Sequence, residues 1–84
     1  MRRSIDDSTD DHRADEDDRP PANWAVAIID DCEGCGEGEL RIALTLEEVG
    51  RSGLGLVAHL APDTARRLRV AIAAAHKEIG EPPD

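Results

Sequence analysis

The chain has 84 residues, a net charge of −9 and a single aromatic side chain, Trp24. This length allows one small domain, whose core has to come from Leu, Ile, Val and Ala. Most of such an acidic molecule would repel a polyanion or an anionic membrane surface, so nucleic acid and membranes are poor partner candidates. No stretch of the sequence has the apolar run of a membrane span or of a secretory signal, and we expect a cytoplasmic protein.

The first 21 residues are polar and acidic. They hold eight acids, four arginines and one isolated isoleucine. Such a segment cannot bury enough apolar surface to offset the entropy cost of ordering, so the composition predicts a disordered tail over residues 1–21. The remaining residues predict a folded domain over 22–80 and a short C-terminal tail over 81–84.

Three short apolar runs predict strands. The first is WAVAII, which begins at Trp24. The second covers residues 40–46, where every other residue is large and apolar, so that four such side chains share one face. The third, LGLVAHL, follows the turn sequence GRSG at residues 50–53 and places Val57 and His59 on the face opposite its leucines.

The stretch PDTARRLRVAIAAAHKEIG predicts a helix that begins at Pro62. Proline suits the first helical position, Asp63 lies in the first turn, and Gly80 lies beyond the last turn. The apolar spacing gives the helix one stripe that can face the strands. The predicted fold is therefore α+β, a three-stranded antiparallel meander packed against one C-terminal helix, with a disordered acidic N-terminal tail.

This arrangement leaves apolar and cationic side chains without a partner in a single chain. The helix carries more apolar surface than one sheet needs, and an edge strand stays uncovered, which favours a homodimer. A lone aromatic residue and helix arginines could also contact a partner, with plain core and solvent roles as the alternatives. The candidate contact residues are Trp24, Val57, Arg66, Arg69, Val70, Ala73 and Ala74.

Two cysteines lie in the stretch DDCEGCGEGE, residues 30–39. A redox pair needs a thiol of lowered pKa, and the surrounding acids and glycines disfavour one. A zinc knuckle at Cys32 and Cys35 is a second interpretation, because Cys-x-x-Cys-Gly is half of a zinc ribbon. A calcium loop fails, since Ile42 falls where a bidentate Glu belongs. The leading interpretation is a glycine-rich turn with two idle thiols.

Zinc would need two further ligands, and the chain has three histidines. If the strands run straight from the knuckle, His59 pairs near Leu44 and lies roughly 15–20 Å from the cysteines. His76 would lie roughly 20 Å away, toward the far end of the helix. The open alternatives are His12 from the tail, nearby carboxylates or the cysteines of a second chain. The expected geometry therefore argues against a histidine ligand from the folded domain.

The stretch AHLAPDTARRLRVAIAAAHKEIG resembles small actinobacterial BldB-like proteins and their short-chain relatives over residues 54–80. Ala61 stands where those proteins usually carry a Ser or Thr cap. The resemblance implies a non-enzymatic, oligomeric regulatory accessory. The residues that carry it are Leu60, Pro62, Ala65, Arg66 and Leu68.

The sequence shows no catalytic constellation, because His59 has no accompanying nucleophile or second histidine near it in the sequence. We therefore expect no enzyme, but a small homodimeric interaction or regulatory module that needs no cofactor. One alternative is a zinc-binding protein that uses Cys32 and Cys35. Another is an inhibitor or antitoxin-like binder whose acidic tail orders on a basic protein partner.

Overall fold

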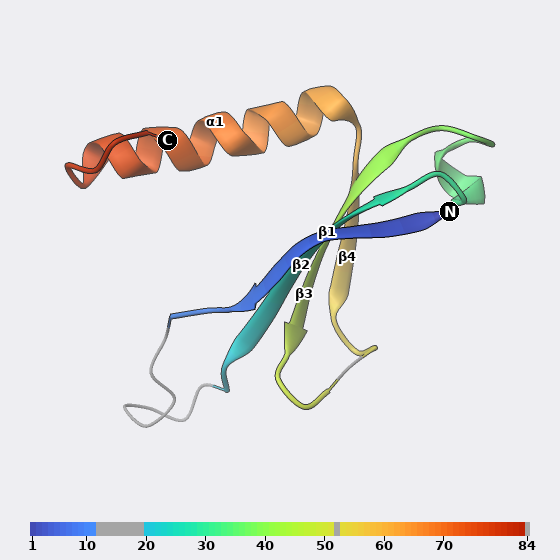
Figure 1. Cartoon of the computed structure of the whole chain (residues 1–84), viewed down its shortest axis with the longest axis horizontal. Helices are drawn as coiled ribbons and strands as arrows, with labels where there is room; N and C mark the ends of the chain where they lie inside the picture. The colour runs from blue at the N-terminus through green and yellow to red at the C-terminus, as the bar shows by residue number, and fades with distance from the viewer. Residues whose placement is uncertain (12–19, 52, 84) are drawn as a thin grey trace.

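The structure, a computed structural model that describes residues 1–11, 20–51 and 53–83, has one antiparallel sheet and one C-terminal helix (Figure 1). The sheet has four strands in the order β1-β2-β3-β4, so each strand pairs with its neighbour in sequence. The α+β class is confirmed. The elements are β1 Arg2–Thr9, β2 Ala22–Ile29, a 3-10 turn η1 Glu33–Cys35, β3 Arg41–Glu48, β4 Leu56–Leu60 and α1 Pro62–Glu78.

The prediction of three strands is wrong, because Arg2–Thr9 forms β1 inside the segment assigned to a disordered tail. β1 pairs with β2 from Arg2 opposite Ile29 to Thr9 opposite Asn23, with a register shift between Ser4 and Asp6. All eight of its side chains are exposed, so main-chain hydrogen bonds hold the strand and its side-chain composition gives no sign of it. The rest of the predicted tail includes residues 12–19, which lie outside the described residues.

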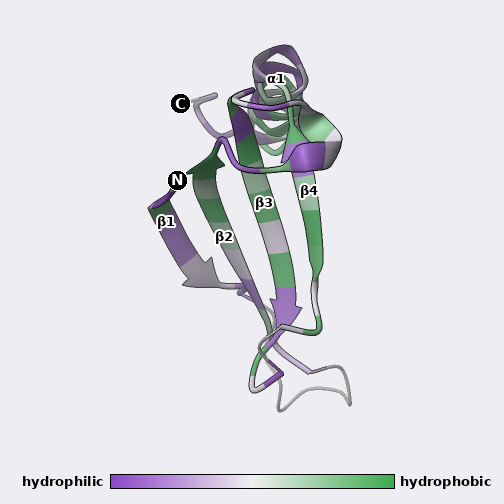
Figure 2. Cartoon of the chain, turned by 90° about the vertical axis from the view of Figure 1, so that its right-hand side faces the viewer, coloured by the Kyte–Doolittle hydropathy of each residue, from purple (hydrophilic) through white to green (hydrophobic). Residues whose placement is uncertain are grey.

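The register defines two faces of the sheet, since residues directly opposite each other in antiparallel strands point the same way. Hydrophobic residues run along β2, β3 and β4 (Figure 2). What we call the knuckle face carries mostly small residues, and the wedge face carries most of the large ones. The knuckle face comprises Ala25, Ala27, Ile29, Ala43, Thr45, Val57 and His59, and the wedge face Trp24, Val26, Ile28, Ile42, Leu44, Leu46, Leu56, Ala58 and Leu60.

The buried core lies on the knuckle face. Ala43 is fully buried, Ala27 and Ile29 are almost so, and Cys32 from the β2–β3 connection packs against them. Thr45 is buried on the same face. The sequence had predicted the face with the large residues as the core. The structure buries the knuckle face instead, because the β2–β3 connection folds over the small residues of that face.

Helix α1 leaves the end of β4 and points away from the wedge face, so that helix and sheet enclose an open wedge (Figure 1). One extended residue, Ala61, separates β4 from Pro62, and an extended conformation is what a residue before proline prefers. This short junction sets the helix direction. The expected close packing of helix on sheet is not found, because Leu68, Ile72 and Ile79 are all exposed.

The C-terminal end of α1 is closed by a glycine motif. Gly80 has a φ of +83°, its N–H donates to the carbonyl of Lys77 at 3.1 Å, and the N–H of Glu81 donates to the carbonyl of His76 at 2.8 Å. This is the Schellman arrangement, which satisfies two carbonyls at the helix end. No helix in the described part of the chain has the length and apolar character needed to cross a membrane.

Candidate metal centre

The two cysteines lie on either side of one tight turn. The N–H of Cys35 donates to the carbonyl of Cys32 at 3.2 Å, and the N–H of Gly36 donates to the carbonyl of Glu33 at 3.2 Å. Gly36 has a φ of +114°, and a Cβ there would lie 2.9 Å from Cγ of Glu39. Glycine is therefore required at this point for the chain to turn back toward the sheet.

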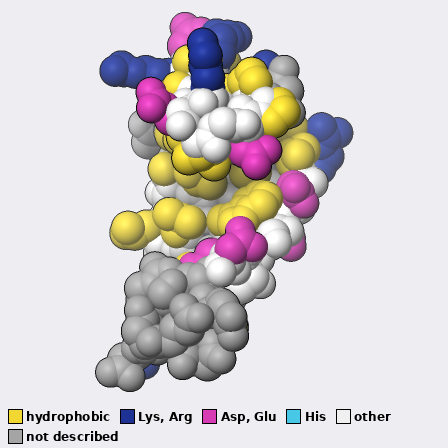
Figure 3. Space-filling view, turned by 90° about the vertical axis from the view of Figure 1, so that its left-hand side faces the viewer, with side chains coloured by type: hydrophobic (Ala, Val, Ile, Leu, Met, Phe, Trp, Pro, Cys, Tyr) yellow, Lys and Arg dark blue, Asp and Glu magenta, His cyan; other side chains and the backbone are white. Residues whose placement is uncertain are grey.

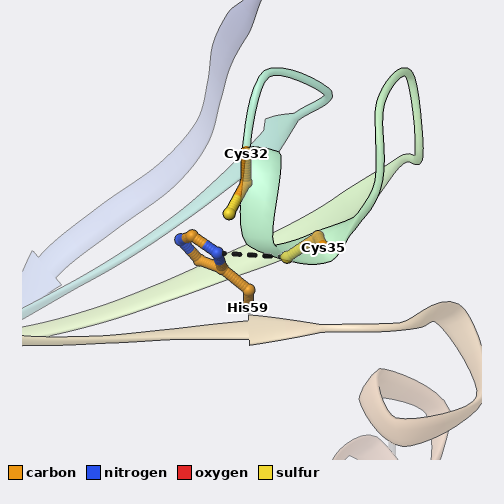
Figure 4. A group of neighbouring side chains, drawn as sticks. All are labelled: Cys32, Cys35 and His59. Atoms are coloured by element: carbon orange, nitrogen blue, oxygen red, sulfur yellow. Dashed lines mark hydrogen bonds between the residues drawn. The ribbon is translucent and has the colours of Figure 1, made fainter.

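The side chain of His59, on β4, points toward the two cysteines (Figure 4). It lies on β4, opposite Ala43, on the knuckle face. Its Nδ1 is 3.4 Å from Sγ of Cys35, and the ligand atoms of Cys32, Cys35 and His59 all lie within 4.8 Å of one another. Both cysteines are free thiols and half-buried, and His59 is exposed.

The prediction that His59 lies too far from the cysteines is wrong. The register differs by only one residue, with His59 opposite Ala43 rather than Leu44. The larger error was the assumption of a straight strand, because β3 begins only at Arg41 and the connection before it folds back over the sheet. Of the other histidines, His76 lies on α1 outside this group, and His12 is not among the described residues.

The local hydrogen bonds make the two thiols unequal. A hydrogen bond from the Cys35 thiol, with the backbone N–H groups of Cys35 and Gly34, lowers the pKa of Cys32, although burial and the charge of Asp31 oppose this. The same thiol contact, followed by burial, raises the pKa of Cys35, and the positive charge of Arg41 acts against the rise. Cys32 is therefore the thiol that ionises first, and a thiolate is the form that binds metal.

The side chain of Arg41 binds the backbone of the turn that carries the cysteines. Its Nη2 donates to the carbonyl of Cys35 at 3.3 Å, and its Nη1 donates to the carbonyl of Leu40 at 2.9 Å. Nη1 also lies 3.7 Å from a carboxylate oxygen of Glu39. Arg41 was not predicted as a site residue, although it stands out in the sequence as the only Lys or Arg between residues 20 and 50.

The donor set suits a tetrahedral metal. Metal–ligand bonds of about 2.0–2.3 Å at tetrahedral angles place ligand atoms roughly 3.5–3.8 Å apart, close to the observed Cys35–His59 distance. Two sulfurs and one imidazole nitrogen fit zinc, whereas calcium and magnesium prefer oxygen ligands. With three protein ligands, a fourth position is left for water or for a group from another molecule.

The structure places the seven predicted contact residues in three different environments. Trp24 is half-buried on the wedge face, and Arg69 and Ala73 line the wedge from the helix. Val57 lies on the knuckle face, half exposed. The structure does not bring the remaining three to the wedge: Arg66 pairs with Asp63 in the first turn of α1, and Val70 and Ala74 are exposed.

No family model, curated protein or solved structure matches this chain. The resemblance to BldB-like proteins therefore stays a prediction.

Proposed function

We propose that this is a small zinc-binding protein whose metal is held by Cys32, Cys35 and His59. The observation that supports the proposal is the convergence of three ligand atoms within 4.8 Å, one of them from a strand 24 residues beyond Cys35. Bound zinc would tie the β2–β3 connection to the end of β4. Because α1 begins three residues after His59, the metal would also steady the junction that directs the helix.

The competing interpretations of the knuckle account for less of this geometry. A turn with idle thiols explains the 3.4 Å contact between Cys35 and His59 as a hydrogen bond, but it gives no reason for Cys32 to join the same group. A redox pair could use the lowered pKa of Cys32, but it gives no role to the His59 nitrogen, which contacts Cys35, the thiol whose pKa is raised. A metal uses all three donors at once, and its binding requires both thiols to lose their protons.

The test is native mass spectrometry of the whole chain after incubation with zinc, compared with His59→Asn. We expect one zinc per chain, and we expect His59→Asn and Cys32→Ser to lose it. His76→Asn is the matched control, because it removes another imidazole outside the group, and it should keep the metal. Cobalt substitution adds an independent readout, since thiolate ligation gives charge-transfer absorption that Cys32→Ser should remove.

The proposal is overturned if His59→Asn binds zinc with the affinity and stoichiometry of the unchanged chain. It is also overturned if the chain binds no zinc at all. The alternative in which an acidic arm binds a basic partner stays a prediction, although Arg2–Thr9 is already paired with β2.

A further inference from the structure

The wedge between α1 and the sheet is an open apolar groove with a volume of about 270 Å³. Val26 and Ile42 line it from the wedge face, and Ala65, Leu68 and Ile72 line it from the helix. α1 meets the sheet at the β4–α1 junction, and its C-terminal part extends beyond the sheet (Figure 1). A single chain therefore brings two apolar surfaces toward each other without closing them.

Large apolar side chains remain in contact with solvent both in the groove and beyond it. Ile72, which lines the groove from the helix, is 52% exposed, and Leu56 and Leu46, on the wedge face beyond the groove lining, are 80% and 52% exposed. Hydrophobic side chains gather beneath the helix when the molecule is viewed from this side (Figure 3). Contiguous exposed apolar surface of this kind marks an interaction site in a soluble protein.

We infer that a second copy of this chain closes the wedge, with α1 of each copy lying in the wedge of the other. Two-fold symmetry requires a surface that complements itself. The chain meets this condition because it carries both parts, a helix that projects beyond its own sheet and an uncovered apolar sheet face. In a two-fold contact, the apolar side of α1 from each copy would cover the wedge face of the other copy.

The charge distribution favours this surface over any other for self-association. The chain has a net charge of −9, so two copies repel each other through most of their surfaces. Residues 51–84, which include α1 and β4, hold four acids against five Lys and Arg and are close to neutral. The nine wedge-face residues named above are uncharged, and the charged residues on the same side of the sheet, Arg3, Asp6 and Glu48, lie on the edge strand β1 and at the end of β3. Among the described residues, Arg69 is the one charged residue of the groove lining, so two copies can approach through the wedge with less repulsion than through the acidic surfaces.

The need for a partner follows from the size of the fold. A domain of about 60 residues buries only about 60% of its unfolded surface, and a second copy adds core that one chain lacks. Among the described residues no large side chain is fully buried. This inference goes beyond the proposed zinc site and is independent of it, because His59 and the cysteines lie on the opposite face of the sheet.

The experiment measures the subunit number of the whole chain by native mass spectrometry and by sedimentation across a concentration series. Ile72→Glu places a charge in the groove lining, and Leu56→Glu places one on the wedge face beyond the groove, where the helix of the second copy would lie. Their matched controls are Val57→Glu, the next residue on the other face of β4, and Val70→Glu, exposed on α1 and outside the groove lining. Far-ultraviolet circular dichroism of all four variants reports whether the fold is retained.

We expect the unchanged chain and both controls to be dimers. Leu56→Glu and Ile72→Glu should weaken dimerisation by at least about 100-fold while keeping the fold, because both side chains are exposed in one chain. A monomeric unchanged chain at high micromolar concentration overturns the inference. It is equally overturned if Leu56→Glu and Ile72→Glu remain dimers, or if the controls dissociate to the same extent.

The same spectra separate this inference from the zinc proposal. A dimer without zinc leaves the wedge contact standing and removes the proposed metal site. A monomer that carries one zinc supports the metal site and overturns the wedge contact.

Discussion

The two faces of one sheet differ in what they carry and in what covers them. On the knuckle face, Ala43 is fully buried although its side chain is a single methyl group. On the wedge face, Leu46, three residues along the same strand, is 52% exposed. Apart from Ile29, the residues buried on the knuckle face are small, whereas the large residues of the wedge face are half-buried or exposed, which departs from the usual relation between side-chain size and burial.

The difference shows that burial here follows the path of the connections. The β2–β3 connection folds back over the knuckle face, and alanines at positions 27 and 43 let it come close enough to bring Cys32 and Cys35 to His59. The wedge face is covered only at one end, because α1 points away from it. One face is thus completed within the chain, and the other is available to a second copy.

Metal removal is the strongest way to test this contrast, since the three proposed ligands lie on the knuckle face or in the connection that covers it. Binding that occurs only in the folded state adds to the free energy of unfolding, about 2.7 kcal/mol when free zinc is 100 times the Kd. For a domain of this size, chelation should then lower the Tm by about 10–20 °C. Thermal unfolding with and without a chelator measures the effect.

Cys32→Ser serves as the control for that measurement. It should melt at the lower temperature and show no response to the chelator. Equal melting temperatures of the unchanged chain with and without chelator would mean that the knuckle face does not depend on metal.

An added side chain should affect the two faces unequally. Ala43→Leu forces three more carbon atoms under the knuckle and should cost about 1–3 kcal/mol in the free energy of unfolding. Ala58→Leu adds the same atoms to the exposed wedge face and should change it by less than about 0.5 kcal/mol. Both are made in the Leu56→Glu background, so that dimerisation does not enter, and are measured by urea unfolding. Equal costs for the two changes would remove the distinction between the faces.

The sequence predicted the elements that carry a local signal. Alternation identified β3 and the two faces of β4, and Pro62 and Gly80 marked the beginning and end of α1. β4 begins at Leu56 rather than Leu54. At Gly55 the backbone approaches β3 so closely that any Cβ would collide with the carbonyl of Leu46. β1 was missed because its stability comes from backbone pairing, which composition does not report.

The site could be predicted only in part for a similar reason. Cys32 and Cys35 stand out by their spacing, whereas His59 becomes a neighbour only through the folded path of the chain. That path depends on the positive φ of Gly36 and on the hydrogen bond from Arg41 to the knuckle. Neither the φ of Gly36 nor the Arg41 hydrogen bond leaves a periodic pattern or a motif in the sequence. An estimate based on straight strands therefore placed His59 too far from the cysteines.

Arg41 gives the most selective test of how the knuckle is held, and the smallest expected effect. Its side chain is only 22% exposed and its guanidinium donates to the carbonyl of Cys35 at 3.3 Å, so Arg41→Ala should loosen the turn that presents the cysteines. Groups that orient metal ligands typically contribute 10–100-fold in metal affinity, and one long hydrogen bond fits the low end, about tenfold.

Arg51→Ala is the matched control, because Arg51 is an exposed arginine whose guanidinium pairs with Glu48 at 2.8 Å, away from the knuckle. It should leave metal affinity unchanged, since exposed ion pairs contribute about 0–1 kcal/mol and only locally. Competition with a chromophoric zinc chelator measures both variants. Equal zinc affinity in Arg41→Ala and in the unchanged chain would mean that the turn holds its shape through Gly36 and its own hydrogen bonds. The β2–β3 connection would then cover the knuckle face without help from Arg41 at the beginning of β3.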